Sequence, residues 1–317
     1  MHVEALGRLS AGGPPAARDS IFRIASTTKP ITAAATLVLA AEGLIGLDEP
    51  VDRLLPELAG RRVLRRMDGP LHETVPAARA ITVRDLLTFT FGFGMVGEMF
   101  ASPTPWPVVA ATQDLRLATI GPPDPPVPPD PDTWIAGLGS LPLLAQPGER
   151  WMYNTGAQVL GVLAARAAGQ PFSEVLRTRI FEPLGMRDTG FWTADTYRLA
   201  TACQPTPDGL AVWDKPDGKW SRPPEFGDGA AGLVSTASDL LAFARMLLHR
   251  GAGLLPPEAV RAMTTGQLTA AQKARGGLGP GFFDGRSGGS ARRCMTAARS
   301  AGTAAWAPRG WWTRPGT

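Results

Sequence analysis

The sequence is poor in the residues that build disulfide frameworks and metal sites. It has two cysteines, Cys203 and Cys294, among 317 residues, so its fold must rest on a hydrophobic core rather than on cross-links. Its three histidines, His2, His72 and His249, lie far apart and have none of the spacings of zinc ligands. We therefore expect no metal and no other cofactor.

Long apolar segments are also absent. No apolar run approaches the roughly 18 residues that a membrane-spanning helix needs. Residues 1–4 do not begin a basic-then-apolar signal peptide. With 44% hydrophobic and 19% charged residues, the chain has the composition of a globular protein. As written, it is expected to be cytoplasmic and to bind no membrane.

Acidic residues are missing from the end of the chain. Residues 288–317 contain five arginines and no aspartate or glutamate. The net charge of +4 comes from these arginines, because residues 1–287 hold 27 basic and 28 acidic side chains. A nucleic-acid partner would need a basic surface on the folded domain, so the charge balance predicts none.

The residues that offer chemistry begin with Ser26 and Lys29. The apolar stretch up to about Glu42 predicts a helix, with Pro30 in its first turn and Gly43 after its end. Side chains three residues apart lie on one face of a helix, so the serine hydroxyl could hydrogen-bond the lysine amine. Burial against an apolar helix disfavours a charge on the lysine, which could then take the serine proton. A plain N-cap serine beside a solvated lysine is the alternative interpretation.

A second candidate pair, Tyr153 and Asn154, precedes another predicted helix, over about 156–168. The tyrosine hydroxyl could move a proton to and from a neighbouring serine, and Asn154 could donate to Lys29 or to a substrate carbonyl. The alternative is an amphipathic tyrosine at a helix entrance, with Asn154 or Thr155 as the helix cap.

Four segments, in this order, resemble the serine β-lactamase and penicillin-binding protein superfamily. They are residues 22–29 (FRIASTTK), 42–51 (EGLIGLDEPV), 81–88 (ITVRDLLT) and 229–236 (GAAGLVST). The resemblance is to the class C β-lactamases and the related family VIII carboxylesterases, and it extends over about residues 1–287.

This resemblance implies an α+β fold of the β-lactamase/transpeptidase type. An antiparallel sheet would be flanked by helices, and a helical block, roughly residues 50–220, would cover the active site. It also implies that Ser26 is the acylated nucleophile, Lys29 its partner and Tyr153 a proton-transfer residue. The eight-residue spacing from Tyr153 to Gly161 is similar to that of the esterase branch. Asn154, assigned to substrate binding, follows the tyrosine directly, so a strict Tyr-x-Asn motif is not present.

The resemblance further predicts a C-terminal strand with a Lys-Thr-Gly, His-x-Gly or Trp-x-Gly-Gly element, which would supply the second oxyanion donor. Residues 288–317 contain no such element and no period of 2 or 3.6. We interpret them as an aberrant basic tail that arises from a one- or two-base frame-shift near codon 287. Residues 1–287 would form the hydrolase domain, with a shortened N-terminus.

These residues predict a serine hydrolase that cleaves small-molecule esters through an acyl-enzyme on Ser26. A β-lactamase or a D-alanyl-D-alanine carboxypeptidase is the alternative within the family. An inactive, truncated or frame-shifted remnant is the alternative outside it. Trp106, Trp134 and Phe93 could line an acyl pocket, although core packing explains such residues better. The sequence leaves the oligomeric state and the natural substrate open.

Overall fold

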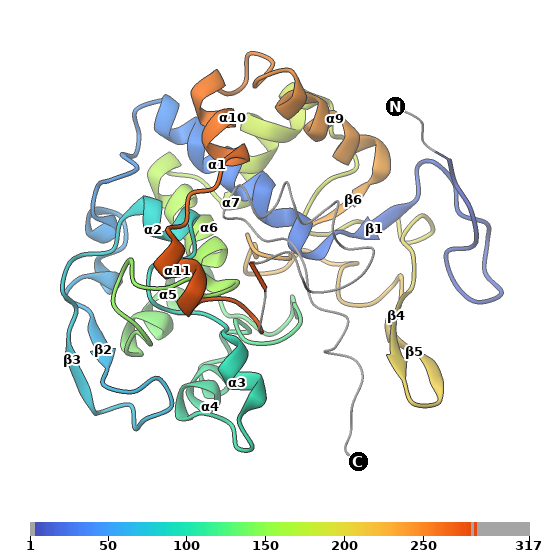
Figure 1. Ribbon diagram of the computed structural model, residues 1–317. Coiled ribbons are helices and arrows are strands. Elements are labelled where there is room, and N and C mark those ends of the chain that lie inside the picture. The colour runs from blue at the N-terminus through green and yellow to red at the C-terminus, as the bar shows by residue number, and fades with distance from the viewer. Residues whose placement is uncertain (1–3, 280–281, 284–317) are drawn as a thin grey trace.

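Helices are the main regular secondary structure of the computed structural model, which describes residues 4–279 and 282–283 (Figure 1). The basic tail 288–317, Cys294 and the predicted frame-shift at 287 lie outside the described residues. The helices are α1 Thr28–Ala41, α2 Val83–Leu87, α3 Gly97–Ala101, α4 Pro107–Asp114, α5 Pro131–Ser140, α6 Thr155–Ala168, α7 Phe172–Leu176, α8 Glu182–Leu184, α9 Ala237–Leu248, α10 Pro257–Thr264 and α11 Ala270–Arg275. Shorter 3-10 turns cover Ala25–Thr27, Val51–Arg53 and Pro56–Leu58, and a π-helical turn, Arg177–Phe181, joins α7 to α8.

The strands are short and antiparallel, and within the described residues they form three two-stranded sheets. Their bounds are β1 Ile21–Arg23, β2 Arg62–Leu64, β3 Thr74–Pro76, β4 Ala202–Thr206, β5 Gly209–Asp214 and β6 Val234–Thr236. β1 pairs with β6, β2 with β3, and β4 with β5. This mixture of helices and small antiparallel sheets confirms the predicted α+β class.

Helices α1 and α6 pack against each other at the centre of the molecule (Figure 1). Nearly all of α1 from Thr28 to Leu39 is buried, and so is α6 from Thr155 to Ala164. A helix that is buried on nearly all sides belongs to the core of a protein rather than to its surface. Because α1 begins two residues after Ser26, its burial brings the start of the helix, and Lys29 with it, into the interior.

Local capping signals begin two helices where the sequence predicts. The Thr82 side chain accepts a hydrogen bond from the Asp85 backbone, and the Asp85 side chain accepts one from the Thr82 backbone, which is a complete capping box. Thr236 accepts in the same way from the Asp239 backbone at the start of α9. These caps satisfy backbone N–H groups that a helix leaves without a partner in its first turn.

The segment 204–228 is not the plain surface excursion that its proline and glycine content predicts. Its first part is strand: β4 and β5 form a hairpin that projects at the right of Figure 1. The turn contains Asp208 and Gly209, and Gly209 has a φ of 122°, which a residue with a side chain rarely adopts. An Asp-Gly pair between two extended runs is a hairpin signal that outweighs the neighbouring prolines.

Three aromatic residues considered for an acyl pocket are in the core instead. Trp134 and Phe93 are completely buried and Trp106 is nearly so, and all three belong to the main hydrophobic cluster. The Trp134 indole N–H donates to the Leu117 carbonyl oxygen at 2.8 Å, as a buried tryptophan usually requires a partner. Core packing is therefore confirmed for these side chains.

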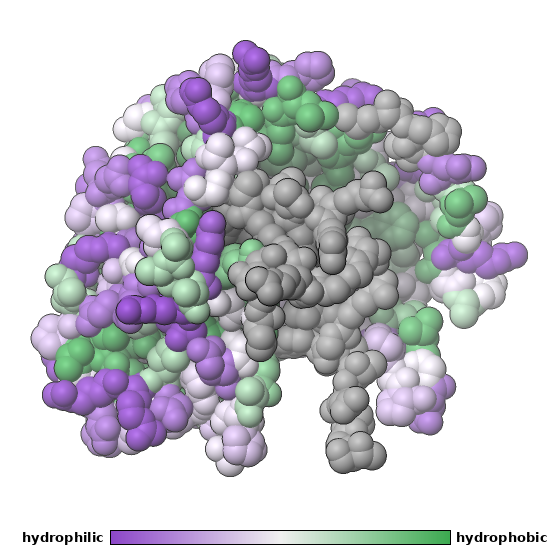
Figure 2. All heavy atoms as spheres, viewed as in Figure 1, coloured by the Kyte–Doolittle hydropathy of each residue, from purple (hydrophilic) through white to green (hydrophobic). Residues whose placement is uncertain are grey.

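The outer surface of the described part is mixed in character. In Figure 2 hydrophilic side chains cover much of the left-hand surface, and hydrophobic side chains appear between them. No helix within residues 4–279 and 282–283 combines the length and the hydropathy that a membrane span requires.

Candidate active site

Ser26 lies in the 3-10 turn between β1 and α1. The turn is fixed by backbone hydrogen bonds from Ile24 to Leu233 and from Thr27 to Ile24, both 3.0 Å long. Ala25 has a φ of 45°, a left-handed conformation that costs a residue other than glycine about 1–2 kcal/mol. Backbone strain of this kind is concentrated at functional sites, where the surrounding structure must hold it in place.

Lys29 is 1% exposed, and its Nζ donates to three oxygens. These are Ser26 Oγ at 3.1 Å, Asn154 Oδ1 at 2.8 Å and the Ala230 carbonyl oxygen at 2.9 Å. Three acceptors match the three N–H bonds of an ammonium group. Among these neighbours the serine hydroxyl is the one with a proton to give, so a neutral Lys29 amine would accept it from Ser26.

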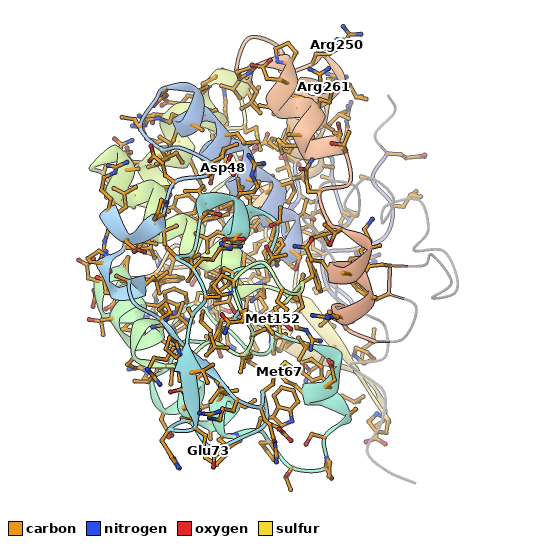
Figure 3. All side chains as sticks on the ribbon, turned by 60° about the vertical axis from the view of Figure 1, so that its left-hand side comes forward. Asp48, Met67, Glu73, Met152, Arg250 and Arg261 are labelled. Atoms are coloured by element: carbon orange, nitrogen blue, oxygen red, sulfur yellow. The ribbon has the colours of Figure 1, made fainter. Side chains whose placement is uncertain are left out.

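Tyr153 completes the contact with the nucleophile. Its Oη lies 2.5 Å from Ser26 Oγ, in a hydrogen bond to which either atom could donate. Its backbone N–H and carbonyl both pair with Met95, at 2.8 and 2.9 Å. Met152, labelled in Figure 3, is completely buried, and its N–H donates to Phe89 at 2.8 Å. Backbone hydrogen bonds of Tyr153 and of the residue before it therefore fix the position of the tyrosine.

Asn154 has an unusual backbone, with φ 84° and ψ −64°. Its neighbours close a three-residue turn, in which the Thr155 N–H donates to the Tyr153 carbonyl at 3.3 Å. This is the geometry of a classic γ-turn, which is rare and strained. Successive side chains of an extended chain point to opposite sides, and this turn brings the Asn154 amide to the same site as the Tyr153 hydroxyl. The turn therefore explains how both side chains reach one site although no residue separates them.

Ser26, Tyr153 and Asn154 line a cavity of about 630 Å³. This volume is in the range of pockets that hold drug-sized ligands. Two tryptophans, Trp213 and Trp220, also line the cavity, with ring centroids 5.5 Å apart. Other apolar lining comes from Ile24, Met95, Pro122, Pro123, Pro205 and Leu278. The cavity therefore suits an apolar substrate group next to the Ser26 hydroxyl.

Among the described residues, two charged side chains line this cavity, and Arg23 is the first. It donates to the Asp214 carboxylate through two nitrogens and to the carbonyl oxygens of Ala200 and Lys215, and it lies over the ring of Trp220. Burial lowers the pKa of Arg23, although the Asp214 carboxylate acts in the opposite direction. The guanidinium is thus engaged in holding the base of the β4–β5 hairpin to β1.

Asp228 is the second charged residue of the cavity wall. It is 8% exposed, and its Oδ1 accepts from the Ala230 N–H at 2.7 Å. Burial raises the pKa of Asp228, against the opposing effects of the Ala230 N–H and of the Lys29 charge.

The structure brings together all four residues that the sequence singles out. Ser26, Lys29, Tyr153 and Asn154 form one hydrogen-bonded cluster, although up to 128 positions separate them in the chain. Their roles in the reaction stay predictions. Sequence reasoning missed the cavity walls, namely Arg23, the two tryptophans and Asp228. The Asp208-Gly209 pair was a signal for the β4–β5 hairpin, which lines part of the cavity. No local sequence pattern marks Asp228.

A family model described as β-lactamase matches residues 3–316, which is nearly the whole chain. The chain belongs to the β-lactamase family. Its fold is therefore of the β-lactamase/transpeptidase type, as the sequence resemblance implies. Members of this family are typically serine hydrolases, and homologues of this chain include esterases and acyltransferases.

Relatives of this β-lactamase-family chain include two bacterial proteins. Protein Rv1367c of Mycobacterium tuberculosis is 39% identical over 287 residues, which are 87% of this chain and 67% of the relative. Esterase EstB of Burkholderia gladioli is 32% identical over 306 residues, which are 89% of this chain and 72% of EstB.

A solved structure supports the same fold. The structure of EstCE1, titled a hydrolase with promiscuous acyltransferase activity, matches with a TM-score of 0.72 and 24% identity. The match covers 87% of this chain and 71% of EstCE1. At this level of identity the likeness establishes the fold.

Proposed function

We propose that this protein is an esterase that hydrolyses neutral small-molecule esters through an acyl-enzyme on Ser26. The observation that carries the proposal is the contact of Ser26 Oγ with both Lys29 Nζ, at 3.1 Å, and Tyr153 Oη, at 2.5 Å. A nucleophile within hydrogen-bonding reach of two proton-transfer groups is the arrangement that covalent catalysis requires. The similarity to an esterase of the same family supports this reaction class.

The reaction follows from the positions of the protons. Ser26 Oγ attacks the ester carbonyl carbon as its proton passes to Lys29 or Tyr153, and the carbonyl oxygen becomes an oxyanion. The Ser26 backbone N–H, close to the N-terminus of α1, would be one donor that stabilises this charge. Collapse of the tetrahedral intermediate breaks the bond to the alcohol oxygen, which takes a proton from Tyr153. Water then attacks the acyl carbon and gives up a proton to the same pair. The bond between the acyl carbon and Ser26 Oγ breaks, the carboxylic acid leaves, and Lys29 or Tyr153 returns the proton to Ser26 Oγ.

The charges of the cavity favour an ester over a β-lactam or a peptide C-terminus. Those two substrates carry a carboxylate, which proteins hold best with an arginine or lysine. Within the described lining the cation is Arg23, and its nitrogens are already bonded to Asp214 and to backbone oxygens. The carboxyl of Asp228 would repel an anion when ionised. A β-lactamase or carboxypeptidase activity is therefore the weaker candidate.

Three substrates or probes test the proposal on the full chain. A fluorophosphonate should label the protein, p-nitrophenyl butyrate should be hydrolysed, and a chromogenic cephalosporin should be turned over at least about 100-fold more slowly. Ser26→Ala should abolish labelling and ester turnover. Ser140→Ala, which removes an exposed serine of α5, should leave both unchanged.

Each alternative has its own result. Faster turnover of the cephalosporin than of the ester would replace the esterase by a β-lactamase. Folded protein that takes no label and turns over neither compound would indicate an inactive remnant.

A further inference from the structure

Asp228 has no part in the mechanism above, although it lies in the cavity wall with Ser26 and Tyr153. Its side chain is directed at its own backbone turn. Oδ1 accepts from the Ala230 N–H at 2.7 Å, and the Asp228 carbonyl oxygen accepts from the Gly232 N–H at 2.9 Å. An aspartate that accepts from the N–H two residues later forms an Asx-turn, which fixes the orientation of the intervening peptides.

The same turn is held from the other side by α1. Thr32 Oγ1 donates to the Gly229 carbonyl oxygen at 2.7 Å, and Lys29 Nζ donates to that of Ala230 at 2.9 Å. A side chain on Gly229 would meet α6, because its Cβ would lie 2.4 Å from the Ala157 carbonyl oxygen. The turn therefore lies in close contact with both central helices. Residue Ala230 has Asp228 on its N–H and Lys29 on its carbonyl oxygen, so Asp228 and Lys29 hold the two consecutive peptides that meet at Ala230.

We propose that Asp228 is a positioning residue for Lys29, a proposal that rests on the esterase function proposed above. By holding the Ala230 N–H, Asp228 directs the Ala230 carbonyl oxygen toward Lys29 Nζ. With Asn154 Oδ1, that oxygen is one of two acceptors that keep the amine 3.1 Å from Ser26 Oγ. Without Asp228 the peptides on either side of Ala230 can rotate, and the amine loses one of these two anchors. A shift of about 1 Å in a reacting group can lower a rate about 100-fold.

This function of Asp228 depends on an oxygen acceptor rather than on a charge. Burial raises the pKa of Asp228, while the Ala230 and Ala231 N–H groups and the Lys29 charge oppose this. A protonated carboxyl still has a carbonyl oxygen that can accept from the Ala230 N–H. Asparagine has the same oxygen in the same place, so Asp228→Asn should keep the turn, whereas Asp228→Ala should lose it.

The experiment compares Asp228→Ala, Asp228→Asn and a matched control, Asp239→Ala. Asp239 is also a buried aspartate, 7% exposed, and it accepts from the Asp188 N–H at 2.9 Å outside the cavity lining. With p-nitrophenyl butyrate, Asp228→Ala should lower kcat about 10- to 100-fold and change KM less than about threefold. Asp228→Asn should keep kcat within about threefold of the wild type. Asp239→Ala should lower the Tm and leave kcat unchanged.

Several results would overturn the proposal. An unchanged kcat in Asp228→Ala, with a loss of Tm like that of Asp239→Ala, would make Asp228 merely structural. An equal loss in Asp228→Asn would show that the charge is what matters. If Asp228→Ala does not fold, Asp228→Ser replaces it, because serine has an acceptor oxygen on a shorter side chain. The kcat of Asp228→Ser should lie between the wild-type value and complete loss. A wild-type kcat in this variant would contradict the proposal. A wild-type protein that hydrolyses no ester would overturn the esterase function itself, and this proposal with it.

Discussion

Two substitutions at Asn154 separate the effect of backbone strain on stability from the effect of a hydrogen bond. Its φ of 84° and ψ of −64° cost a residue other than glycine about 1–3 kcal/mol. Its side chain accepts from Lys29 Nζ at 2.8 Å. Asn154→Ala removes the hydrogen bond and keeps the strain. Asn154→Gly removes the same hydrogen bond but relieves the strain, because glycine adopts a positive φ freely.

The expected difference between the two Asn154 variants follows from these contributions. Loss of a hydrogen bond to a charged group costs each variant about 1.5–3 kcal/mol. Relief of the backbone strain stabilises the folded Asn154→Gly protein by about 1–3 kcal/mol. The greater conformational freedom of glycine in the unfolded chain lowers its stability by about 0.4–1 kcal/mol. Asn154→Gly should therefore unfold with a free energy about 1 kcal/mol higher than Asn154→Ala. In a chain of this size that is a Tm difference of about 2 °C.

Urea denaturation and calorimetry measure the stability of the Asn154 variants, and p-nitrophenyl butyrate measures their activity. Both variants should lose kcat by a similar factor, about 10- to 100-fold, because both remove an acceptor of Lys29. An Asn154→Ala protein at least as stable as Asn154→Gly would refute the strain argument. Wild-type kcat in either variant would refute the importance of the hydrogen bond to Lys29.

Three further predictions concern the proton relay, the cavity wall and acid stability. Tyr153→Phe should lower kcat about 100- to 10,000-fold with little change in Tm, as steady-state kinetics and calorimetry would measure. Trp213→Ala should raise KM about tenfold for a p-nitrophenyl ester of a bulky acid and leave it unchanged for the acetate. Burial raises the pKa of Asp85, but hydrogen bonds from Arg79 and Thr82 outweigh it, so the pKa is lowered in the folded protein. Its stabilisation is present above the unfolded-state pKa of about 4 and is lost as the pH falls through the folded-state pKa. Urea unfolding of Asp85→Asn should therefore show lower stability at pH 7 and a shallower loss below about pH 4.

Interactions between residues close in the sequence were predictable because their geometry is set by the helix itself. Ser26 and Lys29 lie one turn apart, and the capping pair Thr82 and Asp85 needs no distant partner. The contact between Ser26 and Tyr153 spans 127 positions. The residue types suggested a tyrosine beside a serine, but the family resemblance was needed to name Ser26 as its partner. Its distance, and the shared anchoring of Lys29, depend on how α1 and α6 pack.

Features set by tertiary structure were not predictable. The γ-turn at Asn154 contradicts the local preference of any residue with a side chain, so only its surroundings can hold it. The Asx-turn of Asp228 becomes relevant to the site only because α1 places Lys29 against it. The walls of the cavity depend on the position of the β4–β5 hairpin, which the local Asp-Gly signal does not specify.

The β4–β5 hairpin is attached to β1 at its base and is exposed towards its turn. At its base Asp214 is bound to Arg23, three residues before the nucleophile. Close to its turn Leu210 is 76% exposed, and Val212, halfway along β5, is 56% exposed. Gln204 and Trp213, two of the hairpin residues that line the cavity, lie closer to this base than Leu210 does. If the protein is the esterase proposed above, exchanges at these lining positions should change its substrate selectivity, while exchanges at Leu210 should not.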